Sequence, residues 1–99
     1  MVNEGEISTI KLTSGEEVVA KIMKIEDGML VLKQPVSIAP GPQNMQLVPS
    51  MFTADLDKDV IMYGTAISMI APTRADIKAS YIKATSGIDV PPEKKILVG

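Results

Sequence analysis

The sequence lacks cysteine, histidine and tryptophan, and among its 99 residues only Phe52, Tyr63 and Tyr81 are aromatic. The missing cysteines exclude disulfide bonds and thiolate metal sites. The missing histidines remove the commonest general base and the commonest metal ligand. Since no glycine-rich phosphate loop or recognisable catalytic motif is present either, we expect a protein that is not an enzyme and that holds no metal or other cofactor.

Long apolar runs are also missing, and none approaches the ~20 residues of a membrane-spanning helix. The first residues, MVNEGE, lack the basic and apolar regions of a signal peptide. We therefore expect a soluble, cytoplasmic protein without a membrane segment. The length fits one compact domain, and 45% apolar residues supply a core. A domain of this size buries only about 60–65% of the surface of its unfolded chain, so oligomerisation would add burial.

Charge is distributed unevenly along the chain. Residues 1–70 carry five Lys against nine Asp or Glu, a balance of −4, whereas residues 71–99 carry five Lys or Arg against three acidic residues, a balance of +2. An acidic body is a poor general match for a polyanion. Any nucleic-acid site must therefore be local.

Alternating apolar residues and turn signals predict five β-strands in the first 70 residues. Thr13-Ser14-Gly15 and Glu26-Asp27-Gly28 are typical turn sequences that separate the first three strands. The apolar spacing lengthens between Ile22 and Ile25, which predicts a bulge or strong bend near Met23-Lys24. Pro49 favours an edge position for the fourth strand. The predicted strands cover residues 6–12, 16–25, 29–38, 45–53 and 59–70.

The apolar period changes after residue 71. Pro72 to Asp76 is typical of a helix start, and Ile77, Tyr81 and Ile82 form one apolar stripe. We predict a β-barrel domain over residues 1–71, a helix over 72–87 that packs on an open end of the barrel, and a tail over 88–99. Five bent strands of this length close most easily as a small, partly open barrel.

Two segments resemble the motifs of Sm and Sm-like (LSm) proteins. In the second motif, Ile-Arg-Gly-x-x-Ile-x-x-Ile, a glycine follows the basic residue, and residues 59–70 are similar to it. Ala20 replaces the bend glycine of the first motif, and Glu26 replaces its Asp. The resemblance covers residues 6–71 and implies an Sm-like small open barrel of five strongly bent antiparallel strands. The residues that match are Leu12, Gly15, Val18, Ile22, Ile25 and Met29 in the first motif, and Met62, Gly64, Ile67 and Ile70 in the second.

The resemblance also implies a closed homo-oligomeric ring of about five to seven subunits that binds single-stranded RNA near its pore. This sequence departs from the RNA-binding members at three positions. Gly28 stands where a base-stacking side chain is usual, Leu30 replaces the Asn that reads the base edge, and Tyr63 replaces the Arg before the glycine. Tyr63 can stack on a base, whereas Leu30 can neither stack nor hydrogen-bond to one. The candidate RNA-binding residues are Tyr63, Gly64, Lys24, Lys33, Gly28 and Met29.

Two functions stay open at this point. The chain forms a ring that acts as an RNA chaperone or RNA-processing scaffold, or it forms a ring that has lost the RNA pocket and serves as a protein interaction or assembly module. Both require the apolar edges of the open sheet to be covered by a neighbouring subunit. Gly64 either marks a simple bulge or admits a close neighbour. The candidate subunit-contact residues are Met45, Leu47, Val60 and Met62.

Overall fold

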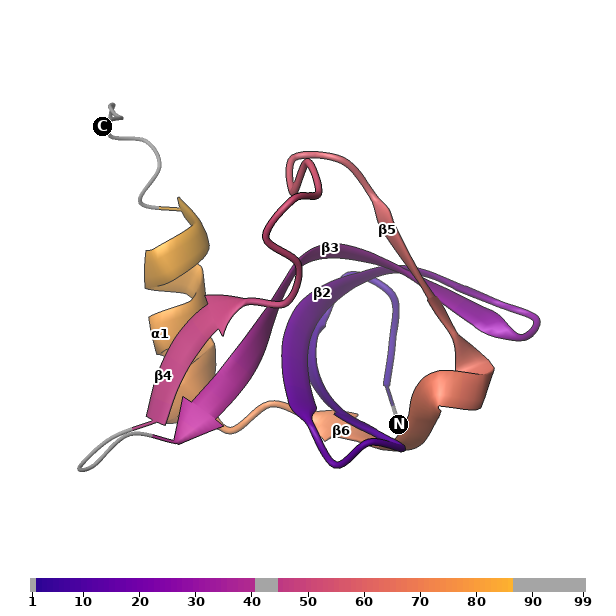
Figure 1. The fold of residues 1–99 in the computed structure, drawn as a ribbon, viewed down its shortest axis with the longest axis horizontal. Coiled ribbons are helices and arrows are strands. Elements are labelled where there is room, and N and C mark those ends of the chain that lie inside the picture. Colours follow the sequence, from indigo (N-terminus) through magenta and orange to yellow (C-terminus); the bar gives the residue numbers. More distant parts are fainter. Residues whose placement is uncertain (1, 41–44, 87–99) are drawn as a thin grey trace.

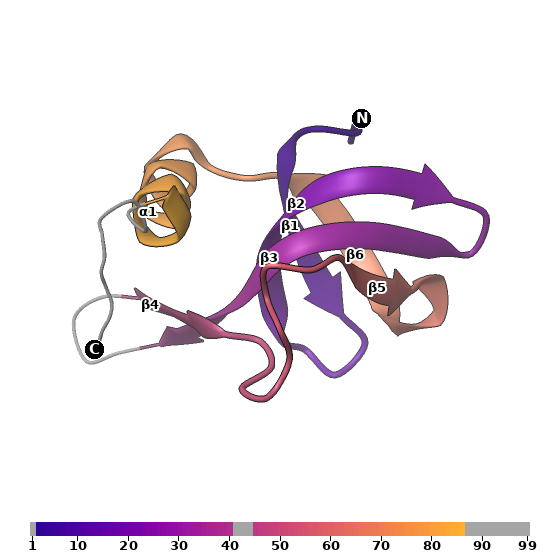
Figure 2. The same ribbon diagram turned by 90° about the horizontal axis from the view of Figure 1, so that it is seen from above.

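A computed structural model describes residues 2–40 and 45–86 of the chain (Figures 1 and 2). The tail predicted over residues 88–99 lies outside the described residues. The elements, in chain order, are β1 (Ile7–Leu12), β2 (Glu17–Glu26), β3 (Met29–Pro40), β4 (Met45–Pro49), β5 (Val60–Tyr63), a 3-10 turn (Gly64–Ala66), β6 (Ile67–Pro72) and α1 (Ala75–Ser86).

All strands belong to one antiparallel, strongly bent sheet with the order β4-β3-β2-β1-β6. β5 also pairs with β3: it lies opposite Met29 to Leu32, whereas β4 lies opposite Val36 to Pro40. β4 and β5 therefore occupy the same side of β3, one after the other, so six strands fill five positions. The sheet curls into an open barrel, visible as the ring of strands in Figure 1. The predicted fold class, a small open barrel of bent antiparallel strands followed by a helix, is confirmed.

Two of the predicted strand boundaries are wrong. The segment 59–70 is not one strand, because β5 ends at Tyr63 and β6 begins only after the 3-10 turn. The N–H of Gly64 still bonds to the carbonyl of Gly28 at 2.8 Å, in register with the pairing of β5 and β3, and the chain then leaves the strand path in the 3-10 turn over Gly64–Ala66. The fourth strand ends at Pro49 rather than at residue 53, since proline cannot donate a hydrogen bond to continue the ladder.

Two bulges between β2 and β3 bend these strands, and a further register shift lies between β1 and β6 at Lys11 and Leu12. The register of β2 against β3 shifts between Ile22 and Lys24, which confirms the bulge predicted at Met23-Lys24. A second shift sets Gln34 and Pro35 of β3 opposite Ala20 alone. Gln34 has a φ of 51°, a left-handed conformation that is uncommon for a residue other than glycine. Each extra residue bends its strand and increases the twist, so the long strands β2 and β3 wrap around the core.

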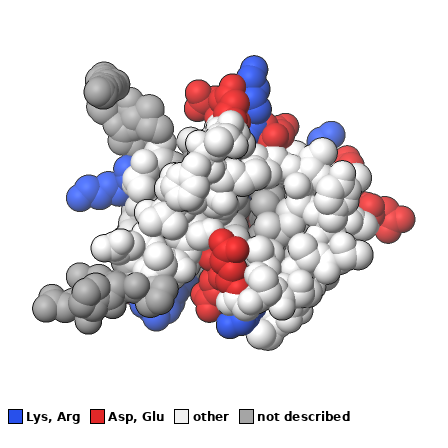
Figure 3. Space-filling view, viewed as in Figure 1, with Lys and Arg blue, Asp and Glu red and all other residues white. Residues whose placement is uncertain are grey.

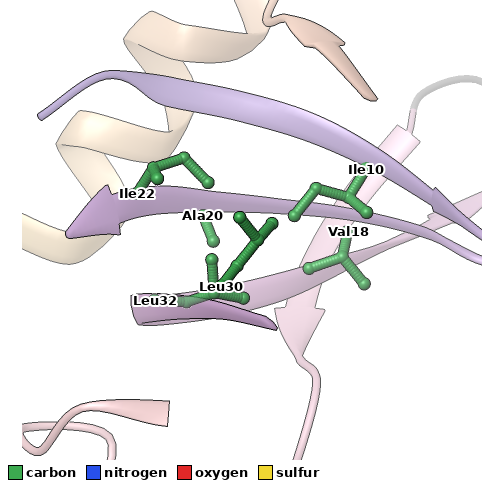
Figure 4. Close-up of a cluster of buried hydrophobic side chains, with 6 residues drawn as sticks. All are labelled: Ile10, Val18, Ala20, Ile22, Leu30 and Leu32. Atoms are coloured by element: carbon green, nitrogen blue, oxygen red, sulfur yellow. The ribbon is translucent and has the colours of Figure 1, made fainter. Parts of the chain in front are cut away.

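The core lies on the concave side of the sheet, where alternate residues of β1, β2 and β3 point toward one another (Figure 4). Val2 packs against this cluster, and Gly5 and Glu6 are hydrogen-bonded to Ile22 through their backbones. The short N-terminal segment therefore covers one end of the barrel, next to the N label in Figure 1. The buried apolar residues of the cluster are Ile10, Val18, Ala20, Ile22, Leu30 and Leu32.

Helix α1 lies on the outer face of the sheet and not on an open end of the barrel, as Figure 2 shows. Tyr81 is 2% exposed, and its hydroxyl lies 3.0 Å from the carbonyl oxygens of both Lys33 and Gln34, at the β3 bulge. Ile77 is half-buried, whereas Ile82 is 44% exposed. In the described part of the chain, no helix is long and apolar enough to cross a membrane.

The hydroxyl of Tyr81 anchors the helix, and its loss should be measurable as lost stability. Burial raises the pKa of Tyr81, opposed by a backbone hydrogen bond from Lys21, so the phenol stays a neutral donor at pH 7. Tyr81→Phe leaves the carbonyls at the bulge without this donor, and we expect the free energy of unfolding in urea to fall by about 1–2 kcal/mol. The difference in the free energy of unfolding between wild type and variant should shrink above pH 10.0. Tyr81 then ionises more readily in the unfolded wild-type chain than in the folded one, because its pKa is raised in the fold. If the difference in the free energy of unfolding is the same at all pH values, the hydroxyl of Tyr81 is not the buried donor that anchors the helix.

Candidate functional site: the Tyr63 face and the open sheet edges

The site is organised around a contact between two glycines. A Cβ added to Gly64 would lie 3.2 Å from the carbonyl oxygen of Gly28 and 3.5 Å from its carbonyl carbon. Gly28 itself has a φ of 78° at the tip of the β2–β3 hairpin, a conformation that suits glycine. The free space at Gly64 is thus filled by the chain's own hairpin tip. Glycine at Gly64 thus suits the close approach of the two backbones, whereas glycine at Gly28 suits its positive φ, because a Cβ there would meet no atom within 4 Å.

Next to this contact, a row of side chains crosses the outer face of three strands. Tyr63 lies opposite Met29, Ile61 lies opposite Val31, and Val31 also lies opposite Lys24. Residues directly opposite each other share a face of the sheet, so these five form one surface. We call them the Tyr63 face. Tyr63 is 62% exposed and Ile61 is 51% exposed.

Not every candidate RNA-binding residue lies on this surface. The structure brings together Gly28, Met29, Tyr63 and Gly64, with Lys24 about 7 Å further along the strands. Lys33 lies four residues from Met29 along β3, at about 13 Å, beside the anchored Tyr81.

Leu30, unlike Gly28 and Tyr63, points into the core of the barrel. It is 8% exposed and belongs to the core cluster. The position that reads the base edge in RNA-binding Sm proteins is therefore an inward-facing apolar residue here. Leu30 therefore adds no polar group to the Tyr63 face.

The candidate subunit-contact residues lie in different environments. Val60 and Met62 are half-buried and pack against the core cluster. Leu47 is half-buried and lines a groove near Ala84 and Thr85 of α1. The side chain of Met45 lies outside the described part of the structure. On β5, the side chains of Val60 and Met62 thus face the core, whereas Ile61 and Tyr63 are exposed.

A groove of about 440 Å³ runs beneath Tyr63 along the open side of the barrel. Apolar side chains dominate its lining: Leu32 and Val18 come from the core, and Met62 and Met51 come from β5 and the segment before it. Tyr63 stands at the rim. Its ring therefore lies between an apolar hollow and solvent, a setting that suits a stacking side chain.

Charge around the Tyr63 face is sparse and mixed. Lys24 is its one cation, while Glu26 pairs with Met29 and Asp27 precedes Gly28. Figure 3 shows Lys, Arg, Asp and Glu scattered over the visible side without a continuous basic patch. Among the described residues, no group of three or more acidic side chains is placed to hold a metal ion.

Both outer strands of the sheet carry unpaired edges within residues 2–40 and 45–86. Because Gly64 directs its N–H toward the β2–β3 hairpin, alternation along the strand directs that of Met62 toward β3 and those of Ile61 and Tyr63 outward. At the opposite edge, Met69 of β6 is 62% exposed and Ile70 is 36% exposed. Ile61 and Met69 are not among the site residues predicted from the sequence. The outward position of Ile61 follows from alternation, because its neighbours Val60 and Met62 point inward.

The fold is similar to the crystal structure of a heptameric archaeal Sm protein. The two chains share 15% sequence identity with a TM-score of 0.51, and the match covers 72% of this chain and 90% of the archaeal chain. No protein-family profile and no curated protein matches the sequence. At this level of identity the comparison shows that the chain has an Sm-like fold.

Proposed function

We propose that the protein forms a closed homo-oligomeric ring in which β5 of one subunit pairs with β6 of the next. The observation that supports this proposal is the pair of apolar, unpaired edges, since Ile61 and Met69 are each more than half exposed on them. Such edges promote aggregation unless they are covered. Joining two different edges is a heterologous contact, which closes into a ring or continues as a filament. The archaeal Sm protein with the similar fold is a heptamer.

The ring is tested by removing one outward N–H from the β5 edge. Ile61→Pro deletes a donor that points away from β3, so the subunit should keep its fold, since proline is tolerated on an edge. The wild type should scatter light as a single oligomer at micromolar concentration, and Ile61→Pro should scatter as a folded monomer.

The matched control is Met62→Pro, which removes a donor directed toward β3 and should unfold the subunit, as circular dichroism would show. A wild-type monomer at these concentrations would contradict the proposed ring.

We further propose that the ring binds single-stranded RNA through stacking on Tyr63. The ring of Tyr63 is exposed, and its backbone is fixed by pairing with Met29 and by the adjoining contact of Gly64 with Gly28. Such an exposed aromatic presents a stacking face to a base, and a base–aromatic stack is worth ~1–3 kcal/mol. Lys24 is placed to contact a phosphate. Repetition around the ring would multiply weak sites through effective concentration.

Stacking predicts a specific pattern of RNA affinities. Tyr63→Ala should weaken binding of oligo-U, oligo-A and random RNA at least about fivefold, since even the low end of a stacking energy is lost. Tyr63→Phe keeps the stacking face and should bind as the wild type does. Lys24→Ala should weaken binding modestly and reduce the salt dependence, because one phosphate contact per subunit is lost. Fluorescence titrations at two salt concentrations measure all three effects.

Light scattering on the same variants separates binding from assembly. If an intact Tyr63→Ala ring binds RNA as the wild type does, or the wild type binds none at low salt, RNA binding is wrong. The ring would then act as a protein interaction or assembly module, a function consistent with the inward position of Leu30. If Tyr63→Ala dissociates the ring, Tyr63 belongs to the subunit contact instead.

A further inference from the structure

The segment between β4 and β5, residues 50–59, presents an unusual pair of exposed apolar side chains. Phe52 is 83% exposed and Met51 is 40% exposed. Phe52 is the single phenylalanine of the chain. A large aromatic side chain left in solvent is a typical anchor residue of a protein contact. We call this stretch the 50–59 segment; it forms the loop above β3 and β5 in Figure 1.

A second feature on the far side of the subunit could receive such an anchor. A groove of about 480 Å³ lies where β6 leads into α1, on the outer face of the sheet. Val19 and Ile38 form its apolar floor, and Ile77 of the helix forms one wall. We call it the α1 groove. The other lining residues are Thr9, Glu17, Ala71, Pro72, Thr73 and Arg74.

Edge pairing in the proposed ring brings these two features together. Every pair of neighbouring strands in this sheet is antiparallel. If β5 pairs in the same way with β6 of the next subunit, the start of β5 at Val60 lies near the end of β6 at Pro72. The 50–59 segment comes just before Val60, and the α1 groove begins at Ala71 and Pro72 and continues to Ile77. A fully extended chain from Phe52 to Val60 spans up to roughly 28 Å, and the turn closed by the hydrogen bond from the N–H of Lys58 to the carbonyl of Asp55 shortens this reach.

The 50–59 segment and the helical stretch beside the α1 groove carry opposite net charge, while the groove lining itself holds Glu17 and Arg74. The 50–59 segment carries three Asp (Asp55, Asp57 and Asp59) against Lys58, a balance of −2. Residues 72–86 carry three cations against Asp76, a balance of +2. Arg74 is already held by Asp76 in a two-pronged ion pair, with both N···O distances at 2.7 Å. Lys78 and Lys83 are exposed on the helix. Opposite charges facing each other favour correct docking over other registers.

We infer that the occupant of the α1 groove is a second copy of this chain: Phe52 of one subunit inserts between β6 and α1 of the next, with its acidic segment beside the basic helix. This inference rests on the proposed ring and deepens it. It gives α1 a role in assembly, since the helix supplies a wall of the receiving groove and the charge that faces the 50–59 segment. It also accounts for the exposure of Phe52 in the isolated subunit.

The absence of cysteine from the chain allows a direct crosslinking test. In the double variant Phe52→Cys/Ala71→Cys, each subunit carries one thiol on the 50–59 segment and one on the rim of the α1 groove. Ala71 is exposed, so the change to cysteine is small. Mild oxidation of the assembled protein should give a ladder of covalently linked subunits on a non-reducing denaturing gel, and reductant should collapse it to monomers.

A matched control uses the same substitutions at a site outside the groove. Phe52→Cys/Ala79→Cys places the second thiol on α1, two residues from Ile77 and thus on a different side of the helix. It should yield no species larger than a dimer. A second readout is Phe52→Ser, which should raise the concentration at which the ring half-dissociates by about tenfold or more, as expected for an aromatic anchor.

The outcomes separate this inference from the ring itself. A ladder from the Ala71 variant and none from the Ala79 variant supports insertion of Phe52 into the neighbouring groove. An intact oligomer by light scattering that gives only monomers on the gel overturns the inference while the proposed ring stands. Equal ladders from both variants also overturn it, because the contact would then lack the stated geometry. A wild-type protein that is monomeric at micromolar concentration overturns the ring and the inference together.

Discussion

The backbone contact between Gly64 and Gly28 is the point at which β5 leaves its partner strand and the chain crosses to the other edge of the sheet. The N–H of Gly64 bonds to the carbonyl of Gly28 at 2.8 Å, and a Cβ at Gly64 would lie only 3.2 Å from that carbonyl oxygen. The bond continues the pairing of β5 with β3, and the 3-10 turn that starts at Gly64 then leads into β6, so the two strands lie at opposite edges of the sheet and not in one continuous strand. Tyr63 precedes this contact and lies beside the hairpin tip. The exposed aromatic and the crossing to the second open edge thus adjoin one contact.

The two faces of the curved sheet have separate tasks. The concave face holds the apolar core, and the N-terminal segment covers one end of it through Val2. The convex face carries α1, which Tyr81 anchors at the bulge of β3. Because the helix lies outside the barrel, it leaves both sheet edges free and sits next to the end of β6. A helix over the open end, as the sequence suggested, would have left the α1 groove without a wall.

The sequence predicted the fold class because its signals are local and agree with one another. Alternation, turn residues and the lengthened spacing at Ile22 to Ile25 gave the bent strands and the Met23 bulge, all of which depend on neighbours in the chain. The break at Gly64 is a 3-10 turn that interrupts an otherwise apolar run, and the apolar pattern on both sides of it led to the prediction of 59–70 as one strand. Likewise, the inward direction of Leu30 follows from register, but the separation of Lys33 from Tyr63 became visible only once β5 was paired with β3.

The central claim is that β5 is paired on one side within the subunit and on the other side within the ring. Amide hydrogen exchange of single residues at high and low protein concentration tests it directly. The N–H groups of Met62 and Gly64 face inward and should be protected at every concentration, whereas those of Ile61 and Tyr63 face the open edge. We predict that Ile61 and Tyr63 are protected in the assembled protein and exchange rapidly after dilution to the monomer. Rapid exchange of both amides in the assembled protein would contradict the account.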